Sequence, residues 1–171
     1  MVSLVKHQQG DLSDFPRVKL LALDVDGVLT DGGLYYTETG EEIKKFNVKD
    51  GLGLKRLMAS GIHVALISAS SSQATFHRAK KLGITHVFTG VDNKLTTLEA
   101  LCELLQLDLG DVAYMGDDWV DVPVLEAVGL SITVADAIAE AKACATYVTE
   151  RGGGQGAVRE VCDLILLHHL P

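Results

Sequence analysis

Short apolar runs rich in Val, Ile and Leu alternate along the chain with longer stretches in which apolar residues recur at helical spacing. This alternation is typical of a parallel β-sheet covered by helices, because the strands of such a sheet are buried on both faces. The runs predicted to be strands are 18–23, 63–68, 86–89, 112–116 and 130–134. We therefore expect an α/β fold with a doubly wound, Rossmann-like parallel sheet and helices on both faces.

Helices are predicted in the stretches between these runs, where apolar residues recur at the spacing of one helix face. Asp50 is expected to cap a helix that ends before Gly61. Gly83 is expected to close a helix over residues 72–82. A further helix is predicted to begin at Lys94, and the remaining helices are expected at 120–128, 137–144 and 157–167.

One segment interrupts the alternation directly after the first predicted strand. Residues 34–37 and 43–46 contain aromatic and aliphatic side chains and flank the turn-forming residues 38–41, a pattern typical of a β-hairpin with a four-residue turn. An isolated hairpin is only marginally stable in water, so it should pack against its own domain or a partner subunit. The predicted elements fill the intervals between the strands, and we therefore expect a capless fold.

The composition is that of one compact domain over residues 1–171, with 47% apolar residues. The apolar runs are too short to cross a bilayer, and the polar stretch 1–14 does not resemble a secretion signal. We therefore expect a cytoplasmic protein with no membrane partner. The formal charge of −8 disfavours nucleic acid as a partner, and it requires any phosphate site to supply its own metal ion and lysine or arginine.

Two aspartates, Asp24 and Asp26, follow the first predicted strand directly. Carboxylates that leave a hydrophobic core are unfavourable unless a cation or a proton relieves their repulsion. A phosphoryl-transfer site with a carboxylate nucleophile needs such a pair, because one acid attacks phosphorus while the other moves a proton. The pair therefore indicates cation-dependent phosphoryl transfer.

Polar residues also follow the other predicted strands, and ligands of a doubly wound sheet bind at the carboxyl ends of its strands. The residues in question are Ser68 after the second strand, Lys94 near the third, and Asp117, Asp118 and Asp121 after the fourth. Each one alone is explained equally well as a helix cap, a turn former or a solvated residue. Their joint order favours a single rim that binds Mg²⁺ and phosphate.

With these motifs the chain resembles the haloacid dehalogenase-like phosphatases. In four stretches, 24–32, 46–51, 116–121 and 153–160, it is similar to the 3-deoxy-D-manno-octulosonate 8-phosphate phosphatase family. The resemblance covers nearly the whole chain. It implies Mg²⁺-dependent hydrolysis of the phosphate ester of a sugar acid, in a homotetramer whose neighbouring subunits cover an open site.

The resemblance also implies roles for the residues of the rim. It makes Asp24 the nucleophile and Asp26 the general acid and base. By the same resemblance, Mg²⁺ is expected to be bound by the Asp24 carboxylate, the backbone carbonyl of Asp26 and the carboxylate of Asp117, with Asp118 and Asp121 in support.

Ser68 and Lys94 match the family's phosphate contacts. Lys49, Arg151 and Arg159 are candidate substrate contacts, the two arginines for the substrate carboxylate. The segment 152–156 resembles a tail that closes over the site, and it is otherwise explained as an ordinary flexible loop.

The chain departs from the family pattern after the second predicted strand. The family usually reads Thr-Gly-Arg there, whereas this chain has Ser68, Ala69 and Ser70, which keep the hydroxyl but lose the positive charge. A nonulosonate 9-phosphate is therefore an alternative substrate to the octulosonate 8-phosphate. A non-catalytic tetramerisation module is an alternative from another class, disfavoured by the complete residue set, and a phosphotransferase is disfavoured because no cap excludes water.

Overall fold

A computed structural model describes residue 15 and residues 17–169 of the chain. The polar stretch 1–14, on which the expectation about secretion depends, lies outside the described residues. Within the described part of the chain, no helix combines the length and apolar character needed to span a membrane.

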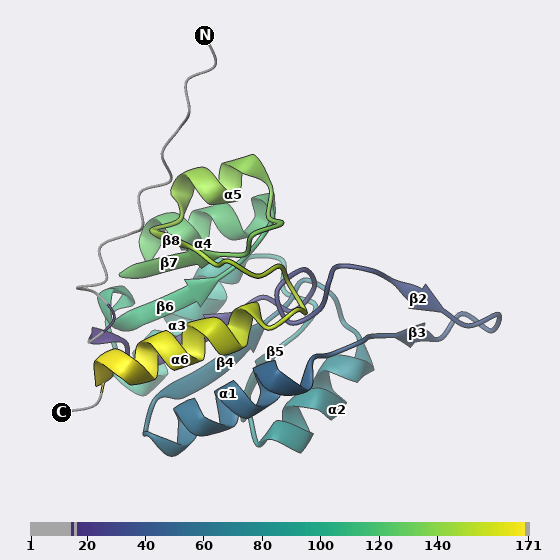
Figure 1. Cartoon of the computed structure of the whole chain (residues 1–171), viewed down its shortest axis with the longest axis horizontal. Coiled ribbons are helices and arrows are strands. Elements are labelled where there is room, and N and C mark those ends of the chain that lie inside the picture. Colours follow the sequence, from purple (N-terminus) through teal and green to yellow (C-terminus); the bar gives the residue numbers. More distant parts are fainter. Residues whose placement is uncertain (1–14, 16, 170–171) are drawn as a thin grey trace, which may run out of the picture.

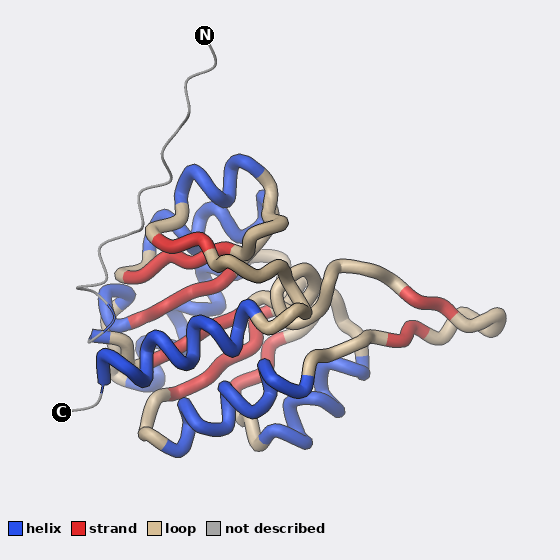
Figure 2. Tube along the Cα trace, viewed as in Figure 1, coloured by secondary structure: helices blue, strands red, loops and turns tan. Residues whose placement is uncertain are grey.

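A six-stranded parallel sheet forms the centre of the fold (Figures 1 and 2). Its order is β5-β4-β1-β6-β7-β8. The strands are β1 (Leu20–Leu23), β4 (His63–Ile67), β5 (His86–Phe88), β6 (Val112–Met115), β7 (Leu130–Thr133) and β8 (Tyr147–Val148). The predicted parallel sheet is therefore confirmed. The edge strand β8 was not predicted, because two residues are too short to show a period.

Helices cover both faces of the sheet, as predicted. On one face, α1 (Val48–Ala59) packs against α6 (Ala157–His169) and α2 (Gln73–Leu82), while α3 (Lys94–Leu105) and α4 (Val122–Ala127) lie on the other (Figure 1). From β1 the chain runs outward through β4 to β5 and then crosses back past β1 to β6. Because each crossover is right-handed, the helices of these two halves lie on opposite faces of the sheet. Shorter elements are α5 (Ala139–Cys144) and the 3₁₀ turns η2 (Leu109–Asp111) and η3 (Trp119–Asp121).

The helix ends differ from the prediction at one cap. Asn47, and not Asp50, caps α1, because the Asn47 side chain accepts the backbone N–H of Lys49 at 2.8 Å. Asp50 is buried in the first turn and accepts the backbone N–H of Arg159 at 2.8 Å, which joins α1 to the start of α6. Gly83 closes α2 in the left-handed conformation, as predicted.

The predicted hairpin follows β1 and consists of β2 (Tyr35–Tyr36) and β3 (Glu42–Ile43). It projects away from the sheet (Figure 1). The strands pair Tyr35 with Ile43, so the connection spans residues 37–41 and is one residue longer than the predicted turn. Within this chain its apolar side chains are about half exposed: Leu34, Tyr35, Tyr36 and Ile43.

The centre of the sheet determines where a ligand site forms. All four residues of β1 are buried, which explains its uninterrupted apolar sequence. Beside β1 the order of the strands reverses, with β4 on one side and β6 on the other. In open α/β sheets such a reversal opens a crevice at the carboxyl ends of the strands. Figure 2 shows the loops that gather at this edge, from which the hairpin projects.

Candidate active site

A cavity of about 360 Å³ lies at the carboxyl edge of the sheet beside β1. It is lined by residues from the loops after β1, β4 and β6 and from the start of α3, among them Asp24, Asp26, Ser68, Lys94, Asp117 and Asp118. The structure therefore brings together six of the seven residues that strand-end placement predicted for the rim. The seventh, Asp121, lies directly beneath them.

Asp24 is buried at the end of β1, where its backbone N–H donates to the carbonyl of Met115 in β6 at 2.9 Å. Its Oδ1 accepts the N–H of Val25 at 2.7 Å and lies 2.9 Å from Nζ of Lys94. Burial and the nearby charge of Asp121 raise the pKa of Asp24 to about 8, although Lys94 opposes the shift. A nucleophilic carboxylate must be ionised, so this position requires a further positive charge.

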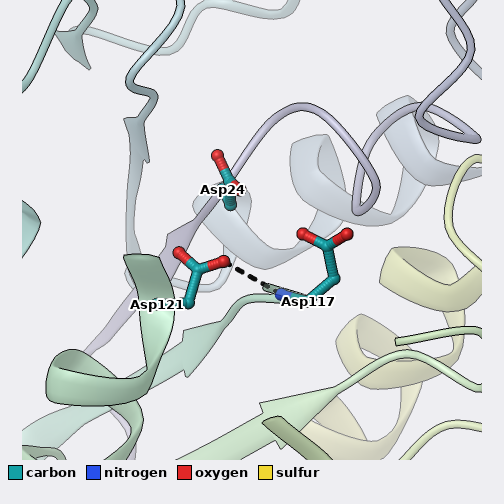
Figure 3. Close-up of side chains that lie close together, drawn as sticks. All are labelled: Asp24, Asp117 and Asp121. Carbon is teal, nitrogen blue, oxygen red and sulfur yellow. Dashed lines mark hydrogen bonds between the residues drawn. The ribbon is translucent and has the colours of Figure 1, made fainter. Parts of the chain in front are cut away.

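One carboxylate oxygen each of Asp24, Asp117 and Asp121 lies within 4.8 Å of the other two, with Asp24 following β1 and both Asp117 and Asp121 following β6 (Figure 3). Among the described residues, the buried Oδ1 of Asp117 has no hydrogen-bond partner. Burial, together with the charges of Asp121 and Asp118, raises the pKa of Asp117 to about 7. A buried carboxylate oxygen without a partner, beside a second carboxylate, suits a hard divalent cation. The residues present therefore fit Mg²⁺.

Asp121 is fully buried, and both of its oxygens are already occupied. Its Oδ1 accepts from Nζ of Lys94 at 2.7 Å and from the hydroxyl of Tyr114 at 2.5 Å. Its Oδ2 accepts the backbone N–H groups of Asp117 at 3.0 Å and Asp118 at 3.2 Å. Asp121 thus orients the acidic loop and the lysine.

Ser68 and Lys94 supply the donors expected for a phosphate. Burial lowers the pKa of Lys94, but the charges of Asp24 and Asp121 raise it overall, so the amine is charged. The Ser68 hydroxyl accepts the backbone N–H of Ser70 at 3.2 Å, which leaves its own hydrogen free to donate.

Lys44 is a residue of the site that the sequence analysis missed. It follows β3 directly, and its side chain is 1% exposed. Its Nζ donates to Oδ1 of Asp26 and lies 3.1 Å from Oε1 of Glu42. Because side chains alternate along a strand, Glu42 and Lys44 share a side, while Ile43 and Lys45 point to the other. This alternation of side chains along the predicted strand was the sequence signal that could have identified Lys44.

The three predicted substrate contacts do not line this cavity in the chain described. Lys49 is exposed in the first turn of α1. Arg151 and Arg159 line a separate cavity of about 550 Å³ between β8 and α6, where Nε of Arg159 lies 2.8 Å from Oδ2 of Asp163.

The glycine-rich segment 152–156 packs closely against the loop that follows Asp26. A Cβ on Gly153 would lie 1.8 Å from the carbonyl oxygen of Gly27. The N–H of Gly154 donates to the carbonyl of Val28 at 3.0 Å, and Nδ2 of Asn47 donates to the carbonyl of Gly154 at 3.1 Å. In this structure the segment therefore supports the aspartate loop, and its closure over a bound substrate stays a prediction.

Known proteins resemble the chain in both sequence and structure. A family model for haloacid dehalogenase-like hydrolases matches residues 81–159. The chain is 50% identical over 150 residues to 3-deoxy-D-manno-octulosonate 8-phosphate phosphatase KdsC of Escherichia coli K12, an overlap of 88% of this chain and 80% of that protein. A crystal structure of 3-deoxy-D-manno-octulosonate 8-phosphate phosphatase from Yersinia pestis matches with a TM-score of 0.91 and 47% identity, over 92% of this chain and 85% of that one.

A third relative was crystallised with ligands. The 3-deoxy-D-manno-octulosonate 8-phosphate phosphatase of Moraxella catarrhalis, in complex with a magnesium ion, a phosphate ion and a KDO molecule, matches with a TM-score of 0.90 and 44% identity, over 92% of this chain and 90% of that one. The chain therefore belongs to the haloacid dehalogenase-like hydrolases and, within them, to the 3-deoxy-D-manno-octulosonate 8-phosphate phosphatase family.

Proposed function

We propose that this protein is a Mg²⁺-dependent phosphatase that hydrolyses 3-deoxy-D-manno-octulosonate 8-phosphate to 3-deoxy-D-manno-octulosonate and phosphate. The observation that carries the proposal is the position of Asp24, which is buried near the ammonium of Lys94 and near an oxygen of Asp117 that has no partner among the described residues. The relative crystallised with magnesium, phosphate and a KDO molecule supports both the cofactor and the substrate.

The first step transfers the phosphoryl group to the protein. A carboxylate oxygen of Asp24 attacks phosphorus, and the bond from phosphorus to the sugar oxygen breaks as an aspartyl-phosphate forms. Asp26, two residues further along the chain, gives a proton to the departing sugar oxygen. Lys94 offsets the charge of the phosphoryl oxygens, and Ser68 donates a hydrogen bond to one of them.

The second step releases phosphate. Asp26 has lost its proton in the first step and now removes one from a water molecule that attacks the phosphorus of the aspartyl-phosphate. The bond between Asp24 and phosphorus breaks, so inorganic phosphate leaves, the Asp24 carboxylate is restored, and Asp26 is protonated again. Both residues thus return to their starting states after one turnover.

Mg²⁺ would be held by the carboxylates of Asp24 and Asp117 and by the backbone carbonyl of Asp26. When bound, it supplies the positive charge that keeps Asp24 ionised and offsets the charge of the transferring phosphoryl group. The raised pKa values of Asp24 and Asp117 support this assignment, because they show that the two carboxylates lack sufficient positive charge by themselves.

Replacing Asp24 by Asn tests the proposed function. Asp24→Asn removes the nucleophile, so we expect Mg²⁺-dependent phosphate release to fall to the background rate while the circular dichroism spectrum is retained. Asp111→Asn is a matched control, because Asp111 pairs with Lys19 near the opposite end of β1. Turnover by Asp24→Asn at the unaltered rate would rule out the carboxylate nucleophile.

A nonulosonate 9-phosphate is the second candidate substrate. Ser70 lines the cavity at the position where the family usually carries an arginine, so that positive charge is missing from the wall of the site. Phosphate release from the two sugar-acid esters, measured side by side with a generic sugar phosphate, decides between them. Selective turnover of the octulosonate ester supports the first candidate, and equal or faster turnover of the 9-phosphate supports the second.

We further propose that the protein works in the cytoplasm as a homotetramer built around the hairpin, with the whole chain forming one catalytic domain. Four apolar side chains of the hairpin are 48% to 61% exposed in the isolated chain, and in the described part of the chain no separate domain lies between β1 and β4 to cover the cavity. A neighbouring subunit would cover both. A purely structural assembly module would not need the acidic site, which disfavours that alternative.

A further inference from the structure

The hairpin places a buried ammonium group against the side chain to which we assign proton transfer. Nζ of Lys44 contacts Oδ1 of Asp26 and Oε1 of Glu42, and the lysine side chain is only 1% exposed. Burying a lysine is unfavourable unless its charge is paired and hydrogen-bonded. The contact is therefore a specific part of the fold rather than one of the solvated ion pairs of a protein surface.

Glu42 connects this contact to the rest of the hairpin. Its Oε2 accepts a hydrogen bond from the hydroxyl of Tyr36 at 3.3 Å, and Tyr36 is its partner across the two strands. The strand pairing thus fixes Glu42, Glu42 holds Lys44, and Lys44 holds Asp26. A charge-assisted network of this kind restricts each side chain to one orientation.

Lys44 occupies only one of the two oxygens of Asp26. Among the described residues none donates a hydrogen bond to Oδ2, and the Asp26 side chain is 30% exposed where it lines the cavity with Asp24. Oδ2 is therefore the oxygen available to the leaving group of a phosphate ester that reacts at Asp24.

We propose that Lys44 is a positioning residue for proton transfer: by holding Oδ1 of Asp26, it directs Oδ2 toward the oxygen of the departing sugar. The inference rests on the proposed function, in which Asp26 protonates that oxygen. It makes the hairpin part of the catalytic machinery, in addition to any role in assembly.

The test compares two esters that differ in their need for a proton. A sugar alkoxide leaves slowly unless it is protonated, whereas p-nitrophenolate leaves readily without protonation. The value of kcat/KM reports the steps up to formation of the aspartyl-phosphate, so it isolates the step in which Asp26 acts as an acid. Lys44→Met removes the ammonium and keeps the length of the side chain.

For Lys44→Met we expect kcat/KM for 3-deoxy-D-manno-octulosonate 8-phosphate to fall at least about tenfold more than kcat/KM for p-nitrophenyl phosphate, because well-placed acid catalysis contributes about 10²-fold or more. Asp26→Asn should show the same selectivity for the ester, with a larger loss. Equal losses on the two esters, or no loss, would overturn the inference.

Lys45→Met is the matched control. Lys45 is the next residue of the same strand, but its side chain is 65% exposed and pairs with Asp31 at 3.2 Å, so both esters should be hydrolysed at the unaltered rates. If Lys44→Met does not fold, Glu42→Gln replaces it, because that change removes the carboxylate charge that pairs with the ammonium of Lys44. The same selective loss is then expected, and equal or absent loss again contradicts the inference.

Measurements on the unaltered protein distinguish a failure of the proposed function from a failure of the role assigned to Lys44. Absence of Mg²⁺-dependent turnover of both esters overturns the proposed function, and the role of Lys44 with it. Turnover by the unaltered protein, combined with non-selective loss in Lys44→Met, overturns the role of Lys44 alone.

Discussion

At the scale of single residues, the site places acids where charge is unfavourable. Asp24 and Asp117 are held by the fold at positions where burial and neighbouring carboxylates raise their pKa values to about 8 and about 7. Their usual pKa is 3.8. Because the fold favours the protonated forms of these two acids while a cation binds their ionised forms, the binding of a cation is coupled to the loss of protons.

Binding of Mg²⁺ is expected to weaken as the pH falls from 8 to 6, the range in which the two raised pKa values lie. The cation binds only the ionised carboxylates, so protons compete with it and are released when it binds. Calorimetric titrations at pH 7 in buffers of different ionisation enthalpy measure this release, which should decrease in Asp117→Asn. Mg²⁺ affinity that is independent of pH would contradict the assignment.

The same pKa values determine the sign of a stability effect. Without Mg²⁺ the folded chain binds more protons than the unfolded chain between the usual pKa of 3.8 and the raised values, so these groups reduce stability as the pH rises through that range. Bound Mg²⁺ removes the repulsion. It should therefore raise the melting temperature more at pH 8 than at pH 6.

At the scale of elements, the loop after β1 is held by segments distant in sequence. Asn47 at the start of α1 binds the carbonyl of Gly154, and Asp50 in the same helix binds the N–H of Arg159 at the start of α6. Gly153 then lies against Gly27 with no room for a side chain. The packing of α1 against α6 thus determines the position of the loop that carries Asp26.

Gly153→Ala is expected to destabilise the fold and to reduce activity. The added Cβ would lie 1.8 Å from the carbonyl oxygen of Gly27 and 2.7 Å from that of Thr30, so the aspartate loop must shift. Overpacking of this kind costs about 1–3 kcal/mol. Urea unfolding measures the loss. Gly110→Ala, whose Cβ would meet no atom within 4 Å, is the control, and equal stability of the two variants would contradict the packing argument.

At the scale of the whole molecule, the exposed hairpin and the open cavity are the two features that support the proposed assembly. The cavity lies at the edge of the sheet from which the hairpin projects, and no separate domain is inserted between β1 and β4 to cover it (Figure 1). A shared interface would therefore protect apolar surface and restrict access of water to the site.

Replacing the cross-strand pair Tyr35 and Ile43 by Ser should dissociate the assembly. The two side chains are 48% and 53% exposed in the isolated chain, and burial of such side chains is what would drive association. Sedimentation velocity at micromolar concentration should show a smaller species than for the unaltered protein. Leu104→Ser, at an apolar side chain on α3 that is 74% exposed, should leave the mass unchanged. A monomeric unaltered protein would contradict the proposal.

The sequence by itself determined the parallel sheet, most of the helices and the order in which polar residues follow the strands. These are local properties, because a strand buried on both faces must be apolar throughout, and the residue after it must lie at the carboxyl edge of the sheet. This is why the sequence alone assigns Asp24, Ser68 and Asp117 to one rim.

Only the tertiary structure decided which of these side chains are hydrogen-bonded to one another and which keep an oxygen available for a ligand. Lys94 and Tyr114, which come from separate elements, both donate to Oδ1 of Asp121, whereas no described residue donates to Oδ1 of Asp117. The contact of Lys44 with Asp26 depends on how the hairpin folds back over 18 residues, and the support of the aspartate loop by Gly153 spans still more of the chain. Such contacts follow from packing between distant segments, which no local pattern of residues specifies.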